Sequence, residues 1–278
     1  MRTIVHLSDL HFGRVDDALL APLRELVERI GPDVVVVSGD LTQRAKSEEF
    51  EQARAYLDTL PGPQIIVPGN HDISLYNVFR RFVQPLKRYK RYISDDLEPS
   101  FVDSEIAVIG VNTARSLTFK DGRVNKEQVE QIRAQLSKLD DTVVRIVVTH
   151  HPFDLPNTED DDDLVDRAPM AMRTFADCGV DLLLSGHMHT SHAANTAERY
   201  KISDFAALVI QAGTATSTRG RGEVNSFNVV RVESARVEVD RYGWDEVGKQ
   251  YSVMRTDAFI RAGDVWTAHT DGMMAAGI

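Results

Sequence analysis

The chain has 278 residues, of which 42% are hydrophobic and 27% charged, and no apolar run approaches the roughly 18–20 residues that a membrane-spanning helix needs. The formal net charge of −10 argues against stable binding to duplex nucleic acid. One cysteine, Cys178, excludes an internal disulfide, and the first residues lead straight into a predicted strand with no room for a signal peptide, so we expect a cytoplasmic protein.

Short apolar runs rich in Val, Ile and Leu alternate with helical patterns along most of the chain. The runs predict buried strands at Thr3–Ser8, Val34–Ser38, Gln64–Val67, Ile106–Val111, Val143–Thr149, Asp181–Ser185 and Ala206–Gln211. Three apolar stripes at helical spacing begin with Leu19, Phe50 and Val129, and Asn125 with Gln128 resembles a capping box before the third. Strands that alternate with helices predict an α/β fold with much parallel pairing.

Two further runs, Phe227–Val232 and Arg236–Tyr242, predict a closing antiparallel hairpin. In the second, apolar and acidic residues alternate as they do in a half-buried strand. The stretch from about Gly243 onward is harder to place. The sequence leaves open whether it packs on the core, forms a dimer contact or stays partly disordered.

Five short clusters of metal-binding residue types follow the predicted strands. They are Asp9-Leu10-His11, Gly39-Asp40, Gly69-Asn70-His71-Asp72, His150-His151 and Gly186-His187-Met188-His189. Residues that follow the carboxyl ends of parallel strands meet at one edge of a sheet, and carboxylate and imidazole ligands suit transition metals. One such residue alone is more often a cap or a buried hydrogen-bonded side chain. The five clusters together predict a metal site.

The order of these clusters resembles the signature of the calcineurin-like metallophosphoesterase superfamily, which runs D-x-H, G-D, G-N-H-D/E, H and G-H-x-H. Residues 7–13, 38–42 and 67–72 are most similar to its class III cyclic-nucleotide phosphodiesterase branch. The resemblance implies an α/β fold of two mixed β-sheets packed face to face and flanked by helices, a four-layer sandwich. It places a catalytic domain at residues 1–243 and leaves residues 244–278 as a C-terminal extension.

The resemblance also implies two metal sites that share one carboxylate. Asp9, His11 and His189 would bind one ion, Asn70, His150 and His187 would bind the other, and Asp40 would bridge both. The donor atoms suit Fe, Mn, Zn or Co better than Ca, and the sequence does not identify the native metals. Two ions at a bridging carboxylate would share a water and lower its pKa, which gives a hydroxide that attacks phosphorus near neutral pH.

Three residues beside the ligands are supporting candidates. The resemblance places His71 at the leaving group as an acid or charge stabiliser, and we expect Asp72 to orient that imidazole, by a hydrogen bond among other means. Pro152 favours an extended backbone at His151, so we expect the His151 side chain to point away from that of His150 if the strand pleat persists there. Support of the site and a plain structural role are both open for His151.

These residues make a phosphodiesterase acting on a cyclic or other small nucleotide the leading hypothesis. A phosphomonoesterase, a nuclease or a lipid-linked pyrophosphate hydrolase could use the same two-metal site, although the acidic charge disfavours the nuclease. A non-enzymatic scaffold is disfavoured because His71 and all the ligands are intact. The expected partner is a small phosphoester substrate, and homodimer formation is left open.

Three other segments bear on the substrate. Residues 79–92 hold six basic and four aromatic residues, and we favour a helix with solvated cations over a site for an anion. The glycine-rich loop 214–225 contains Arg219 and Arg221, and it is open whether it brings a guanidinium to a phosphate or is an exposed turn. The acidic run at 159–163 is expected to be a solvated loop rather than a metal relay.

Overall fold

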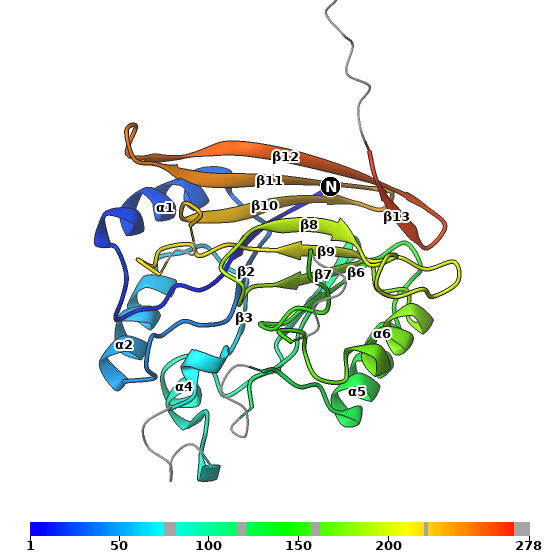
Figure 1. The fold of residues 1–278 in the computed structure, drawn as a ribbon, viewed down its shortest axis with the longest axis horizontal. Coiled ribbons are helices and arrows are strands. Elements are labelled where there is room, and N and C mark those ends of the chain that lie inside the picture. Colours follow the sequence, from blue (N-terminus) through cyan, green and yellow to red (C-terminus); the bar gives the residue numbers. More distant parts are fainter. Residues whose placement is uncertain (75–81, 116–120, 157–161, 220–221, 270–278) are drawn as a thin grey trace, which may run out of the picture.

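The computed structural model describes residues 1–74, 82–115, 121–156, 162–219 and 222–269. Within these ranges two mixed β-sheets pack face to face, with helices on their outer faces (Figure 1). The predicted architecture is therefore confirmed. No helix of the described ranges is long and apolar enough to cross a membrane.

The first sheet has seven strands in the described part of the chain, in the order β13-β12-β11-β10-β1-β2-β3. Their bounds are β1 (Arg2–Leu7), β2 (Val34–Ser38), β3 (Gln64–Val67), β10 (Ser226–Glu233), β11 (Arg236–Asp245), β12 (Gln250–Ala262) and β13 (Val265–Ala268). The three N-terminal strands are parallel to one another, and the other pairs are antiparallel. The expected hairpin is β10–β11, with Phe227 opposite Tyr242.

The second sheet has six strands among the described residues, in the order β4-β5-β6-β7-β9-β8. Their bounds are β4 (Ser100–Val102), β5 (Ile106–Gly110), β6 (Val144–Val148), β7 (Leu182–Ser185), β8 (His192–Asn195) and β9 (Leu208–Gln211). The four central strands are parallel, and the two edge strands pair antiparallel.

Alternation along the strands creates the layers. In β2, Val34 and Val36 lie in the core between the two sheets, whereas Val35 and Val37 face the helices. Helices α1 (Asp17–Ile30), α2 (Ser47–Leu57) and α4 (Lys87–Tyr92) cover the first sheet, and α5 (Lys126–Leu136) and α6 (Ala168–Asp177) cover the second. Because successive strand residues point to opposite faces, an all-apolar strand such as β2 serves two cores at once.

The C-terminal strands fasten the two sheets together. Trp266 in β13 is fully buried, and its indole Nε1 donates at 3.1 Å to Oδ1 of Asp181, which immediately precedes β7 of the other sheet. Arg261 pairs with the same oxygen at 2.8 Å. Residues 250–268, whose packing the sequence left open, are therefore part of the first sheet and of the core between the sheets.

Helix α4 falls in the basic, aromatic segment. Its Tyr89 is fully buried and donates its hydroxyl to the Ile66 carbonyl at 2.9 Å, while Lys87 and Lys90 are exposed. The exposed lysines and the buried Tyr89 agree with the favoured prediction, whereas Phe82 is 52% exposed and Arg88 donates to the Ala45 carbonyl at 2.6 Å. Residues 79–81 of this segment, residues 159–161 of the acidic run and Arg221 lie outside the described residues.

Candidate metal centre

The motif residues come together at the carboxyl ends of parallel strands from both sheets. Asp9 and His11 follow β1, Asp40 follows β2, and Asn70 lies in a 3-10 turn, η1 (Asn70–Asp72), after β3. The remaining motif residues follow two strands of the second sheet: His150 follows β6, and His187 and His189 follow β7. The convergence expected from the strand pattern is thus present in the fold.

Five of the seven predicted ligands have a left-handed backbone. The φ angles are 54° at Asp9, 50° at His11, 52° at Asp40, 71° at His187 and 62° at His189. A non-glycine residue costs roughly 1–2 kcal/mol in this region, and such residues gather at functional sites. Backbone hydrogen bonds between the loops, such as His11 N–H to the Asp40 carbonyl at 2.9 Å, hold the strained turns in place.

The first group of ligand atoms surrounds one carboxylate oxygen. Asp9 Oδ1 lies 3.5 Å from His11 Nε2 and 3.3 Å from His189 Nε2, and the two nitrogens are 3.4 Å apart. This buried oxygen accepts no hydrogen bond from any described residue. The other oxygen, Oδ2, is held by the Ser8 hydroxyl at 2.7 Å and by His187 N–H at 3.1 Å. An orphaned carboxylate oxygen facing two imidazole nitrogens fits a cation.

The second group is built around an amide oxygen. Asn70 Oδ1 lies 3.0 Å from His150 Nε2 and 3.2 Å from His187 Nδ1, and these nitrogens are 3.3 Å apart. His150 Nδ1 donates to the Ser38 carbonyl at 2.8 Å, which directs the lone pair of Nε2 into the group. Three donor atoms that face one another at these separations also fit a cation.

Asp40 links the two groups through one oxygen. Its Oδ2 lies 3.4 Å from His150 Nε2 and 3.8 Å from His11 Nε2, while Oδ1 accepts the His71 N–H at 2.8 Å. Two motif glycines make this packing possible. A Cβ at Gly69 would collide with the Asp40 carboxylate, and a Cβ at Gly39 would collide with the His150 ring.

Burial and mutual charge set the protonation of these side chains without metal. Burial lowers the pKa of His187 to about 3 and also lowers that of His189, so both imidazoles are neutral, as ligands must be. Burial also acts against a charge on His150, but Asp40 outweighs it and raises the His150 pKa to about 9. His150 in turn holds the pKa of Asp40 well below its usual range, against the effect of burial.

His71 faces the first group from outside it. Its ring centroid lies 5.0 Å from that of His11, edge to face. The ring Nδ1 donates to the Gln43 carbonyl at 2.8 Å, and Nε2 accepts from the Arg219 guanidinium at 2.8 Å. The contact between Arg219 and His71 was not predicted, because no pattern in the sequence indicates that the loop of Arg219 lies beside His71.

The prediction that Asp72 orients the His71 imidazole by a hydrogen bond was wrong. The Asp72 carboxylate accepts from the backbone N–H groups of Leu41, Thr42 and Gly69 at 2.9–3.2 Å, and from the Thr42 hydroxyl at 3.0 Å. It therefore ties the loop after β2 to the loop after β3. Both ring nitrogens of His71 already have other partners, so Asp72 positions the loops that carry Asp40 and Asn70.

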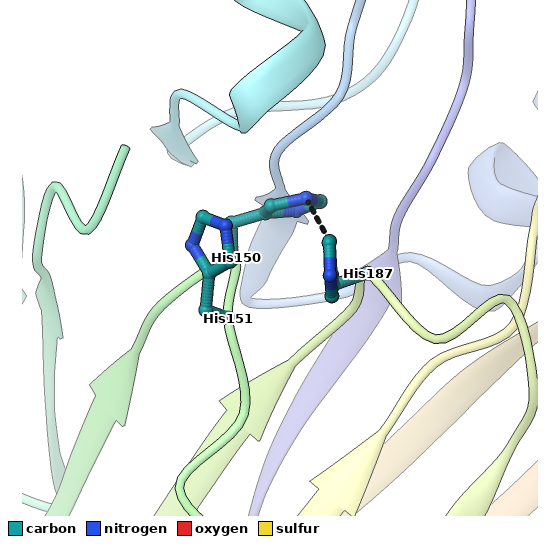
Figure 2. A group of neighbouring side chains, drawn as sticks. All are labelled: His150, His151 and His187. Atoms are coloured by element: carbon teal, nitrogen blue, oxygen red, sulfur yellow. Dashed lines mark hydrogen bonds between the residues drawn. The ribbon is translucent and has the colours of Figure 1, made fainter. Parts of the chain in front are cut away.

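The condition on which the expectation for His151 depended, a strand pleat that continues to this residue, is not met. Figure 2 shows the rings of His150, His151 and His187 gathered together, and the centroids of His150 and His151 are 4.9 Å apart. The pleat does not continue to His151, because β6 ends at Val148. His151 Nδ1 bonds the Thr113 hydroxyl at 2.8 Å. Its ring also approaches that of His187, with centroids 4.7 Å apart, so the three imidazoles form a second set of grouped donor atoms.

Comparison with known proteins identifies the family. A family model described as calcineurin-like phosphoesterase matches residues 2–191, which is more than half of the chain. The chain belongs to the calcineurin-like phosphoesterase family, and it is a metal-dependent phosphoester hydrolase. The resemblance drawn from the five clusters is thereby confirmed.

Two individual relatives each share less than a third of their aligned residues with this chain. The glycerophosphodiester phosphodiesterase GpdQ of Enterobacter lignolyticus is 29% identical over 208 residues, which cover 63% of this chain and 69% of that protein. The 3',5'-cyclic adenosine monophosphate phosphodiesterase CpdA of Escherichia coli K12 is 24% identical over 164 residues, 54% of this chain and 55% of that protein. The chain thus matches about half the length of the second relative.

Solved structures share the fold. A dimetal phosphatase from Danio rerio superposes with a TM-score of 0.64 at 14% identity, covering 87% of this chain and 96% of that one. A structure of PhoD superposes with a TM-score of 0.74 at 11% identity, covering 100% of this chain and 73% of that one. At these identities the likeness concerns the arrangement of strands and helices.

Proposed function

We propose that the chain is a two-metal phosphodiesterase that hydrolyses a small diester, with a cyclic or other small nucleotide as the preferred class. One observation carries the two-metal part. A single oxygen, Asp40 Oδ2, faces both groups of donor atoms, at 3.4 Å from His150 Nε2 and 3.8 Å from His11 Nε2. A shared carboxylate of this kind is what keeps two cations at the spacing used in hydrolysis.

The donor sets assign a residue to each role. Asp9, His11 and His189 would hold one ion, Asn70, His150 and His187 the other, and Asp40 both. When bound, the ions would activate a water and offset charge on the phosphoryl oxygens. Because the Gln43 carbonyl accepts the Nδ1 proton of His71, Nε2 is the ring nitrogen that would act at the leaving group.

The choice of a diester rests on the relatives. GpdQ and CpdA are both named as phosphodiesterases, one for glycerophosphodiesters and one for cyclic AMP. The substrates in these two names share a phosphorus with two ester bonds and one negative charge. The leading substrate class for this chain is therefore a small diester, and the class III resemblance favours a nucleotide.

A kinetic panel tests this proposal. The purified protein is stripped with chelator and reloaded separately with Mn, Zn, Fe or Co. Its kcat/KM is then measured on cyclic nucleotides, glycerophosphodiesters, linear diesters, monoesters and pyrophosphates. We expect a cyclic nucleotide or another small nucleotide diester to have the highest value. A monoester that is better by more than about tenfold, roughly 1.4 kcal/mol of transition-state binding, would overturn the choice of a diester.

A pair of matched carboxylate variants tests the shared site. Asp40→Ala should lose both ions and all turnover, because it removes a ligand from each group. Asp58→Ala changes an exposed aspartate at the end of α2 and should bind metal as the parent protein does. An Asp40→Ala protein with two bound metals per chain would remove the bridging role.

A further inference from the structure

In the described part of the loop after β9, Arg219 contacts the candidate metal centre through both its side chain and its backbone. Arg219 Nη1 lies 2.8 Å from His71 Nε2, and its backbone carbonyl accepts from His189 Nδ1 at 3.3 Å. The side chain therefore contacts the proposed leaving-group histidine, and the backbone orients a proposed metal ligand.

The loop is well anchored beside the centre. Thr216 donates its hydroxyl to the Leu10 carbonyl at 3.0 Å, and Thr218 N–H donates to the Arg14 carbonyl at 2.9 Å. Asn225 Nδ2 holds the Ser217 carbonyl at 2.8 Å from the other end of the loop. The position of Arg219 is thus fixed by the segment between β1 and α1, which also carries Asp9 and His11.

The Arg219 guanidinium has more donors than the described residues use. A guanidinium carries five N–H donors, and His71 Nε2 is the acceptor that the described residues supply to Arg219. No carboxylate of the described ranges lies within ion-pair distance of it, in contrast to Arg231 and Arg241, which each pair with an acid nearby. The half-buried guanidinium has a neutral nitrogen as its acceptor, so its positive charge is not offset by a negative one among the described residues. A phosphate oxygen is a stronger acceptor for a guanidinium than a neutral nitrogen is.

We propose that Arg219 binds the substrate directly, by donating to a non-bridging phosphoryl oxygen at the Asp40 centre. The anion would replace His71 Nε2 as the acceptor of the guanidinium and leave that nitrogen facing the leaving group. This proposal deepens the proposed function and depends on it for the identity of the ligand. It also defines a chemical requirement, since the substrate must keep an anionic oxygen on phosphorus.

Phosphate binding by the metal-loaded protein tests the proposal without any turnover. Titration calorimetry with inorganic phosphate should give a Kd at least about tenfold higher for Arg219→Ala, with Arg219→Lys in between because a lysine keeps the charge but loses the planar fork. Arg14→Ala is the matched control. Its side chain is exposed on the loop that anchors Arg219, and its variant should bind within twofold of the parent. Metal content should be the same in all four proteins.

A double variant tests the alternative that Arg219 only orients the His71 ring and does not bind the substrate. In a His71→Ala background no imidazole is left to orient, so adding Arg219→Ala should still raise the phosphate Kd by about tenfold. If the second change has no effect there, or if Arg219→Ala alone stays within twofold of the parent, the proposal is wrong. If the parent binds phosphate and needs Arg219 for it but hydrolyses none of the phosphoesters in the panel, the proposed function fails and the anion site stands.

Discussion

We expect His6 to make the free energy of unfolding depend on pH, and the surroundings of this residue give the sign and size of the effect. It lies in β1, fully buried between the sheets, with Nε2 2.9 Å from the Ser38 hydroxyl. Nδ1 has no hydrogen-bond partner among the described residues. Burial lowers the pKa of His6 from 6.5 to about 3, with the nearby charge of Asp9 acting in the opposite direction. The native state therefore keeps this imidazole neutral where the unfolded chain is already protonated.

The sign and size follow from proton linkage. Below pH 6.5 the unfolded chain binds a proton that the native state does not, so stability falls as the pH falls, until about pH 3. Between pH 7.5 and pH 5 the loss from this one group is about 2 kcal/mol. Any native pKa below about 4 gives the same loss, because the native imidazole is then neutral at pH 5.

Urea unfolding at these two pH values, with chelator present, measures the effect. The parent protein should lose about 2 kcal/mol more than His6→Gln on going to pH 5, since glutamine does not titrate. Ser38→Ala is the control, because it removes the hydrogen-bond partner of His6 at both pH values and should leave the pH dependence in place. Equal losses in the parent and His6→Gln would refute the reasoning.

Three further outcomes are expected. His71→Ala should keep its metal content while turnover falls by about 10²–10⁴-fold, and unchanged turnover would exclude it from the reaction. Trp266→Ala should lower the free energy of unfolding by about 3–5 kcal/mol in urea, because it opens a cavity and removes the indole hydrogen bond to Asp181; a loss below about 1 kcal/mol would contradict this. Gly69→Ala should displace the Asp40 carboxylate and reduce bound metal with unchanged circular dichroism, and full metal occupancy would show that the loop accommodates a methyl group.

Much of the fold was predictable because most strands are buried on both faces. Val34–Ser38 and Gln64–Val67 have the predicted bounds, since most residues of a strand that is buried on both faces are apolar and form a short continuous run. Strands β8 and β12 were missed because they are partly exposed and have no apolar run. Pairing with β9 and β11 makes them strands. Helix α6 was missed because Arg167, in a left-handed conformation, precedes it in place of a capping side chain.

The candidate site was also predictable only in part. Local spacing indicated which residues converge, because each one follows a strand end. Spacing gave no information on contacts between loops, and those decide the supporting roles. Asp72 bonds the loop of Leu41 rather than its neighbour His71, and Arg219 reaches His71 across 148 positions of the chain.

The left-handed turns at five predicted ligands lower the stability of the protein at residues that hydrolysis would require. The fold holds those residues in a backbone conformation that is unfavourable for any residue other than glycine. The same fact means that glycine at Asp9 or Asp40 would relax the chain while removing a ligand. Selection for a more stable protein would therefore act against this site, and only a requirement for hydrolysis would retain its side chains.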